Sequence, residues 1–136
     1  MGERERTDAQ RAVLALARLN LALSTAAVRA AKDPDVAGSQ PVLVLFALDM
    51  DGPMRPTGIQ ELTGLSSGGV TKLVERLEEK GLVARKTGAV SDDRRGVLVE
   101  LTRRGRNTVR SMADSMAGAL PDIRPVATDL AEALHV

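Results

Sequence analysis

The hydrophobic period of this chain changes from 3.6 to 2 directly after Gly81, and this change constrains the fold more than any other feature. Ahead of the glycine, four apolar residues have the i, i+3, i+4, i+7 spacing of an amphipathic helix: Val70, Leu73, Val74 and Leu77. Beyond it, two short alternating segments, 82–86 and 96–101, flank the polar, turn-rich stretch 87–95. The pattern predicts a helix closed by a left-handed glycine and followed by a β-hairpin.

The rest of the chain has helical spacing and turn signals, without alternating strand–helix units. We therefore expect a mainly α fold with a small β-hairpin in a single domain, 1–136. The expected helices cover 7–32, about 40–50, 57–64, 66–80, a fifth after Thr102 and a sixth from Pro121. As N-caps we expect Thr7, Ser66 or Ser67, and Thr102, with a capping box of Thr57 and Gln60.

Several function classes are excluded by what the composition lacks. The chain has no Cys, which removes disulfides, thiolate metal sites and thiol redox sensing. Its one His, His135, lies next to the end of the chain, a poor place for a general base or a metal ligand. We therefore expect no enzyme, no metal and no cofactor. Adjacent Asp92 and Asp93 are interpreted as turn residues.

The longest uninterrupted apolar run, PVLVLFAL at 41–48, is far shorter than the ~20 residues of a membrane helix. The opening segment MGERERTDAQ is charged and lacks the apolar core of a secretory signal. We therefore expect a cytoplasmic protein with no membrane partner.

Charge is distributed unevenly along the chain although the net charge is only +1. Between Met54 and Arg110 there are 12 Lys or Arg and 7 Asp or Glu, so this middle segment carries +5 and the flanks carry −4. A basic middle between acidic ends is expected when one part of a protein contacts phosphate. A solvated basic face without a partner would have the same composition.

Residues 57–81 have the outline of a helix-turn-helix: a short helix, a turn with a glycine, and a longer helix. A recognition helix enters the major groove by its N-terminal residues, and here those residues are small, polar or basic. The predicted DNA-contacting residues are Ser66, Ser67, Gly68, Thr71, Lys72 and Arg76. Gly68 and Gly69 each lower helix stability by roughly 1 kcal/mol relative to Ala. Close approach of DNA and loose selection at a fraying first turn both remain open as reasons for them.

The hairpin loop supplies a second group of cations. We predict that this wing contacts DNA through Arg85, Lys86, Asp93, Arg94 and Arg95. Arginine in such a loop suits the narrow minor groove, and an aspartate can hold an arginine in place by a charge-assisted hydrogen bond. The alternative is a charged loop that only faces solvent.

At this point the sequence resembles the MarR family of bacterial transcriptional regulators. The resemblance rests on IQELTGLSSGGVTKLVERLEEKGLV at 59–83 and SDDRRGVLVELTRRG at 91–105. These contain a GLS turn, a small, polar helix start, an L-E-x-x-G-L close, an Asp-x-Arg wing signature at Asp93 and Arg95, and a Leu-Thr-x-x-Gly helix start.

The resemblance implies a winged helix-turn-helix lobe at 37–101, with dimerisation helices at 1–34 and 102–136. It further implies a homodimer that binds double-stranded DNA at a pseudo-palindromic operator, as a repressor or an activator. Relief by a small-molecule effector bound between the dimerisation helices and the lobe is also implied. The alternative function is a winged-helix module for protein–protein contact that does not bind DNA.

Overall fold

The computed structural model is an arch of helices with one small sheet, and it describes residues 6–36, 38–87, 96–118 and 120–136. Its elements in chain order are α1 (Asp8–Ala30), the 3-10 turn η1 (Pro34–Val36), α2 (Ser39–Asp51), α3 (Pro56–Thr63), α4 (Ser67–Glu79), β1 (Val83–Thr87), β2 (Val97–Leu101), α5 (Arg103–Ala117) and α6 (Leu120–Ala133). The predicted class, mainly α with a β-hairpin, is confirmed.

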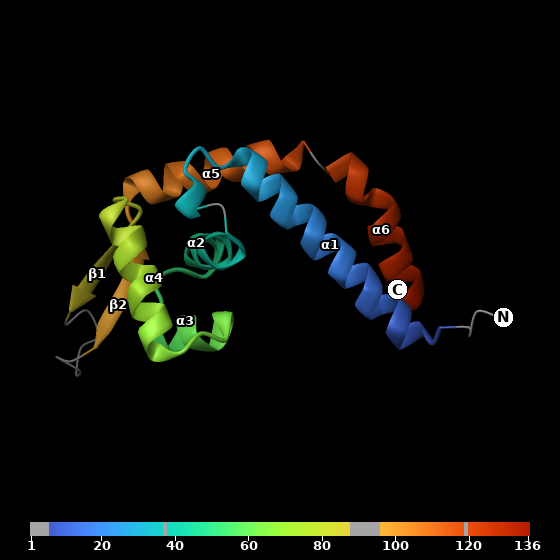
Figure 1. Ribbon diagram of the computed structural model, residues 1–136, viewed down its shortest axis with the longest axis horizontal. Coiled ribbons are helices and arrows are strands. Elements are labelled where there is room, and N and C mark those ends of the chain that lie inside the picture. Colours follow the sequence, from blue (N-terminus) through green and yellow to red (C-terminus); the bar gives the residue numbers. More distant parts are fainter. Residues whose placement is uncertain (1–5, 37, 88–95, 119) are drawn as a thin grey trace.

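Two parts of the arch are bridged by α5 (Figure 1). We call α2, α3, α4, β1 and β2 the lobe, and α1 with α6 the helical leg. The long helix α5 runs along the top of the arch from the lobe toward α6, with the lobe at one of its ends and the leg at the other.

The sheet is an antiparallel pair whose register runs from Val83 opposite Leu101 to Thr87 opposite Val97. A third segment joins it through an isolated bridge in which Met54 and Val99 exchange backbone hydrogen bonds of 2.9 and 2.8 Å. The bridge attaches the start of α3 to the base of the wing.

Local capping explains where most helices begin. The Thr7 hydroxyl accepts from the Gln10 amide in a capping box, and Ser66 and Thr102 each accept from the amide three residues on. These N-caps confirm the predictions. The capping box predicted at Thr57 is wrong: α3 begins one residue earlier, with Arg55 as N-cap and Pro56 in the first turn. Proline's fixed φ suits that position and needs no side-chain cap.

The core of the lobe is aliphatic. Leu45 from α2, Ile59 from α3, Leu77 from α4 and Val99 from β2 are all fully buried. The predicted stripe on α4 is buried along its whole length, which fixes the opposite side of that helix toward solvent. Gly81, with a φ of 73°, has the left-handed backbone predicted for it and turns the chain into β1.

Gly105 holds α5 against the lobe. A Cβ built at this position would lie 2.0 Å from the backbone oxygen of Leu82, closer than any real contact. The same oxygen accepts the Thr102 amide at 3.0 Å, and the Thr102 hydroxyl donates to the Gly81 oxygen at 2.6 Å. The first turn of α5 therefore sits directly on the strand that leads into the wing.

Substituting Gly105→Ala is expected to lower the free energy of unfolding by about 1–3 kcal/mol, because the added methyl forces α5 away from Leu82. Denaturant unfolding followed by circular dichroism measures the change. Asp114→Ala, on the exposed side of the same helix, is the control and should stay within about 0.5 kcal/mol of the parent. Equal stability of the two variants would contradict the close contact.

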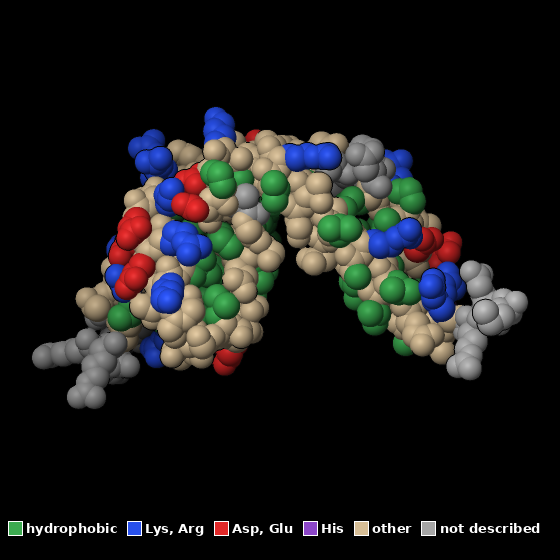
Figure 2. Space-filling model, in the orientation of Figure 1, with side chains coloured by type: hydrophobic (Ala, Val, Ile, Leu, Met, Phe, Trp, Pro, Cys, Tyr) green, Lys and Arg blue, Asp and Glu red, His purple; other side chains and the backbone are tan. Residues whose placement is uncertain are grey.

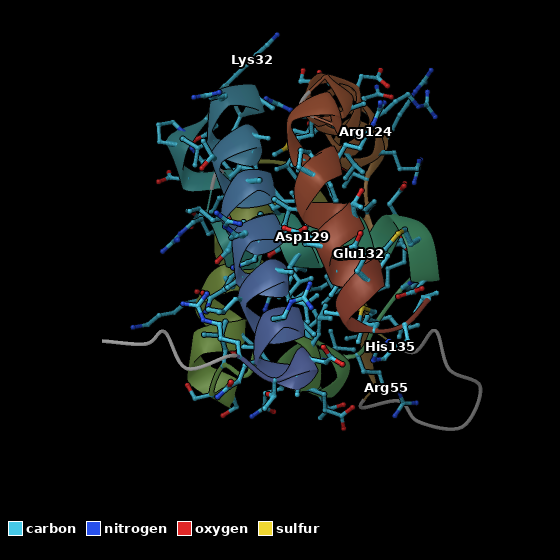
Figure 3. All side chains as sticks on the ribbon, turned by 90° about the vertical axis from the view of Figure 1, so that its right-hand side faces the viewer. Lys32, Arg55, Arg124, Asp129, Glu132 and His135 are labelled. Carbon is cyan, nitrogen blue, oxygen red and sulfur yellow. The ribbon has the colours of Figure 1, made fainter. Side chains whose placement is uncertain are left out.

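The helical leg buries little of its own apolar surface. Helix α1 packs on α6 through small residues such as Ala12 and Ala15, both of which are buried, whereas Ala27 near the other end of α1 is buried in the core cluster with α2 and α5. Side-chain contacts join the two helices near the chain ends. The ring Nε2 of His135 lies 2.8 Å from a carboxylate oxygen of Asp8, and Arg11 lies 4.0 Å from a carboxylate oxygen of Glu132. Figure 3 shows the two helices side by side with Glu132 and His135 toward the same end.

Large apolar side chains of α1 stay exposed, notably Leu21 at 67%, Val13 at 64% and Val28 at 58%. Hydrophobic side chains accordingly gather on the leg in Figure 2. Among the described residues, α1 is the one helix long and apolar enough to cross a membrane by length and composition. The apolar sequence of α1 is interrupted by three arginines, Arg11, Arg18 and Arg29. The longest uninterrupted apolar run of the sequence, 41–48, lies in α2 instead.

Candidate nucleic-acid interface

Helix α4 presents a continuous polar face opposite its buried stripe. Of the predicted contact residues, Ser66 is the N-cap and its hydroxyl accepts the Gly69 amide at 3.1 Å. The others are all exposed: Ser67, Gly68, Thr71, Lys72 and Arg76. The first turn therefore offers unpaired backbone amides at the positive end of the helix dipole, followed one turn later by a lysine. This arrangement can bind a phosphate and admit base edges alongside it.

Thr71 already uses its hydroxyl proton inside the helix, donating to the Ser67 carbonyl at 3.0 Å. The oxygen can still accept a hydrogen bond, while donation to a base would require breaking the internal bond. Thr71 is therefore suited to accept from an adenine or cytosine amino group.

The two glycines of α4 differ in their surroundings. A Cβ at Gly69 would lie 3.3 Å from the Leu65 Cβ, a tight contact with the turn. A Cβ at Gly68 would meet nothing within 4 Å, and its backbone is ordinary helix. The fold therefore constrains position 69, whereas nothing within the described chain requires glycine at 68.

One of the acids at the C-terminal end of α4 forms an ion pair with a residue at the base of the wing. Arg85 of β1 makes a two-pronged contact with Glu78, with nitrogen–oxygen distances of 2.9 and 3.4 Å. The hydrogen bond from Arg85 lowers the pKa of Glu78, and the same bond raises the pKa of Arg85. Lys86 similarly lies 2.8 Å from Glu100 on the neighbouring strand. Both cations are exposed, and both anchor the base of the wing to acids of the lobe.

The other predicted wing residues, Asp93, Arg94 and Arg95, lie outside the described residues. They remain predictions from the sequence.

Lys80 connects the end of α4 to the chain between α1 and α2 through ion pairs. It was not among the site residues predicted from the sequence. Its Nζ lies 2.7 Å from Asp33 and 3.3 Å from Asp35. The hydrogen bond from Lys80 lowers the pKa of Asp33, and hydrogen bonds to both acids raise the pKa of Lys80. No pattern in the sequence signals this pair, because its members are far apart along the chain.

Across the described ranges, no three or more His, Asp and Glu side chains are grouped as a metal site requires.

Comparison with known proteins finds a family resemblance over the part of the chain that carries this interface. The model described as the MarR family matches residues 39–96. An uncharacterised HTH-type transcriptional regulator of Bacillus subtilis, YcgE, is 49% identical over 55 residues. That match covers 40% of this chain and 35% of YcgE, so the likeness spans about a third of the relative's length.

Two solved structures extend the likeness to most of the chain. BpsR from Bordetella bronchiseptica, described in terms of regulation of its DNA binding by 6-hydroxynicotinic acid, has 25% identity and a TM-score of 0.61 over 79% of this chain and 80% of its own. A mutant of MarR from E. coli in complex with operator DNA has 19% identity and a TM-score of 0.63 over 81% of this chain and 74% of its own.

Proposed function

We propose that the protein is a MarR-like, sequence-specific transcriptional regulator that binds double-stranded DNA, which the match of residues 39–96 to the MarR family model supports. The observation that carries the proposal is the exposed face of α4, where small, polar and basic residues stand opposite a buried aliphatic stripe. A helix built this way can enter the major groove by its first two turns without opening the core. A protein of the same fold, MarR from E. coli, is described in complex with operator DNA, which supports DNA binding.

We propose that the wing contributes a second contact, with Arg94 and Arg95 in the minor groove and Asp93 orienting them. Arg85 and Lys86 then fix the base of the wing and can add phosphate contacts from its edge. The regulator acts in the cytoplasm and catalyses no reaction.

Selection of bound fragments from the genome of the source organism tests the proposal directly. The expected result is a small set of fragments that share an inverted repeat with half-sites about one helical turn apart. Retention of no duplex DNA at low salt would overturn the proposal and favour a winged-helix module that binds proteins.

The helical leg supports a homodimer as the binding form. The exposed apolar side chains of α1 form a wider surface than α6 covers, and a second copy of the leg would bury them. A two-fold dimer also fits a pseudo-palindromic operator, with one lobe for each half-site.

Sedimentation at micromolar concentration is expected to give twice the 14.4 kDa mass of the chain. Replacing Leu21 by Glu should shift the protein toward monomer, since a charge would have to be buried in the interface. Met50→Glu, at a more exposed apolar position on the lobe, is the control and should leave the dimer intact. Because the chain has no Trp or Tyr, interference optics are needed for detection. A monomeric parent would contradict the dimer.

We further propose that a small-molecule effector relieves DNA binding. The support is that DNA binding by BpsR is described as regulated by 6-hydroxynicotinic acid. Whether the regulator represses or activates follows from where its operator lies relative to the promoter.

A further inference from the structure

Two contacts of different kinds hold the C-terminal end of α4 against the elements above the lobe. One is the close packing of the first turn of α5 on the backbone of Leu82. The other is the set of ion pairs that Lys80 makes with Asp33 and Asp35, and we call these three residues the clamp. Both contacts act on the short segment 80–82, at the end of α4 that lies opposite its exposed first turn.

The acids of the clamp are held in place by their own backbone. One carboxylate oxygen of Asp33 accepts the Asp35 amide at 3.0 Å, while the other lies 2.7 Å from the Lys80 Nζ. Asp35 belongs to the 3-10 turn η1, whose last residue, Val36, is buried in the core cluster of the lobe. Asp33 itself follows the end of the leg helix α1 by three residues. The clamp therefore connects α4 to the point where the chain leaves the leg.

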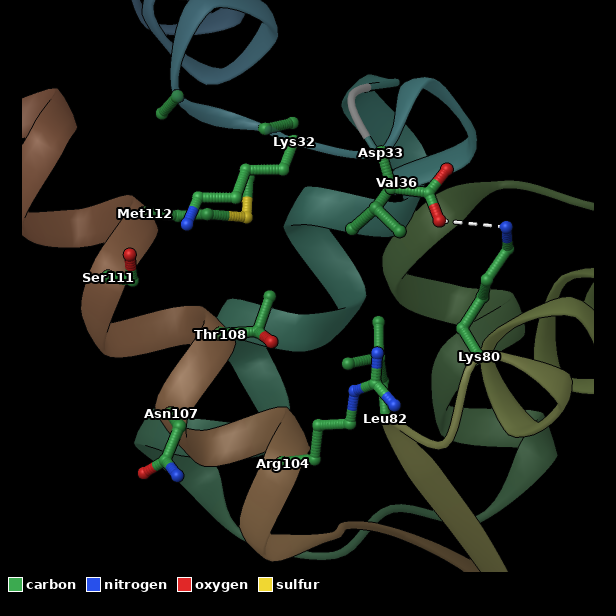
Figure 4. A pocket seen from close by; sticks show the side chains of 12 residues that line it. Lys32, Asp33, Val36, Lys80, Leu82, Arg104, Asn107, Thr108, Ser111 and Met112 are labelled. Atoms are coloured by element: carbon green, nitrogen blue, oxygen red, sulfur yellow. Dashed lines mark ion pairs between the residues drawn. The ribbon is translucent and has the colours of Figure 1, made fainter.

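A cavity of about 340 Å³ lies between the clamp and α5 (Figure 4). Lys80 and Asp33 stand at one side of it, and Thr108 and Met112 of α5 stand at the other. Closely packed surfaces resist rotation against each other, and surfaces separated by a cavity resist it much less. Across this cavity, the position of α4 relative to α5 therefore depends on the ion pairs of the clamp more than on packing.

A small rotation at this end of α4 becomes a large displacement at the other end. The helix has 13 residues and is therefore ~20 Å long. A rotation of about 10° around Lys80 would move the first turn by roughly 3.5 Å, which is close to the rise of one base pair along a DNA strand. The first turn is the part of α4 that the proposed function places in the major groove.

We propose that Lys80 is a positioning residue that sets which half-site spacing the dimer accepts, through its ion pairs with Asp33 and Asp35. The step rests on the proposed function, because it requires two lobes, joined by their legs, on one operator. With the clamp closed, each α4 keeps one orientation relative to its leg, which fixes the distance between the two first turns. With the clamp broken, each lobe can pivot on α5, and operators with other spacings become acceptable.

The clamp contributes orientation more than it contributes stability. The side chains of Lys80, Asp33 and Asp35 are 35%, 38% and 58% exposed. Ion pairs with this much exposure add little to folding, because solvent and salt screen them. Variants of the clamp are therefore expected to fold like the parent, with a circular dichroism spectrum and a denaturation midpoint close to the parent's.

Operators whose half-site spacing differs from the selected one by one or two base pairs test the proposal at a single salt concentration. The parent is expected to bind the selected spacing at least ~30-fold more tightly than any other. Lys80→Gln and Asp33→Asn should each reduce this ratio to about threefold or less, and the two together should do no more, because they break the same pair. Lys80→Arg should keep the ratio, since a guanidinium can pair with both acids.

The matched control is Lys86→Gln, which breaks an ion pair of similar length, 2.8 Å to Glu100, inside the lobe. It should change the affinity for all spacings by the same factor and keep the ratio of the parent. An unchanged ratio in Lys80→Gln would overturn the proposal. An equal loss of affinity at every spacing would overturn it as well, because it would assign Lys80 to a phosphate contact.

The orientation of the lobe can also be measured without DNA. Since the chain has no Cys, spin labels can be attached at Glu61→Cys on α3 and Asp114→Cys on α5, both exposed positions. An excess of unlabelled parent leaves one labelled chain in each dimer. Double electron–electron resonance should give a narrow distance distribution for the parent and for Lys86→Gln, and one at least about twice as wide for Lys80→Gln. Equal widths would overturn the clamp.

The two measurements separate the clamp from the proposed function. A protein that binds no duplex DNA, but has the wider distribution in Lys80→Gln, would overturn the proposed function and the spacing role with it, while the hold of the clamp on the lobe stands. A protein that binds its operator with the same spacing ratio and the same width in Lys80→Gln would overturn the clamp and leave the proposed function.

Discussion

Raising the salt concentration from 50 to 200 mM is expected to weaken binding of the operator by ~10³–10⁵-fold. Each lobe offers cations on one face, of which Lys72 and Arg76 on α4 are exposed and form no ion pair in the described ranges. Two lobes and two wings should make roughly 6–10 phosphate contacts, each of which releases condensed counterions. Fluorescence anisotropy of a labelled operator over a series of salt concentrations measures the slope.

The slope can be assigned to residues by substitution. Lys72→Gln is expected to reduce the slope of log K against log salt by about 0.9 for each phosphate that the lysine no longer neutralises, hence about twice that in a dimer. Glu75→Gln on the same helix is the control, because removing an acid should raise affinity while every phosphate keeps its cation. A flat salt response in the parent would refute the electrostatic part of the interface.

The local features of the fold could be predicted because they depend on neighbours in sequence. The stripe on α4, the caps at Thr7, Ser66 and Thr102, and the left-handed Gly81 each follow from residues within one or two turns. The start of α3 shows the limit of such rules. Two signals competed there, a capping box at Thr57 and a proline at 56, and the proline prevailed because its backbone already has helical φ.

The features that escaped prediction join segments distant in the chain. The bridge of Met54 to Val99 needs the hairpin to fold back on the chain before α3. The pairing of Lys80 with Asp33, and the cavity beside it, need α4, α5 and the end of α1 to meet. Neither has a sequence period or motif, since tertiary packing alone brings these residues together.

Likewise, the motif predicted which residues belong to the site, but it could not predict which of their charged side chains form ion pairs within the protein. The sequence predicted Arg85 and Lys86 as DNA-contacting residues of the wing, and in the structure each of them faces an acid of the lobe. Their expected contribution to DNA affinity is correspondingly smaller than that of Lys72, which has no such partner in the described residues.

Gly68 is expected to show opposite effects on stability and on DNA binding. The sequence left two explanations for this glycine open. A Cβ added at position 68 would meet nothing within 4 Å, so the described fold does not require a glycine there. Gly68→Ala and Gly68→Leu should therefore raise the free energy of unfolding by about 0.5–1 kcal/mol, from helix propensity alone. If DNA approaches the backbone here, affinity for the operator should fall with side-chain size, by about tenfold for Ala and about 100-fold for Leu.

Denaturant unfolding and operator anisotropy on the same preparations separate the two effects. Gly58→Ala is the matched control: this glycine lies inside α3, and its added methyl would meet only the flexible end of Met54 at 3.6 Å. It should gain stability like Gly68→Ala and keep the parent's operator affinity. If Gly68→Leu were stabilised and bound the operator as tightly as the parent, the glycine would reflect loose selection in the first turn. The face of α4 that enters the groove would then have to begin at Thr71, one turn further along the helix.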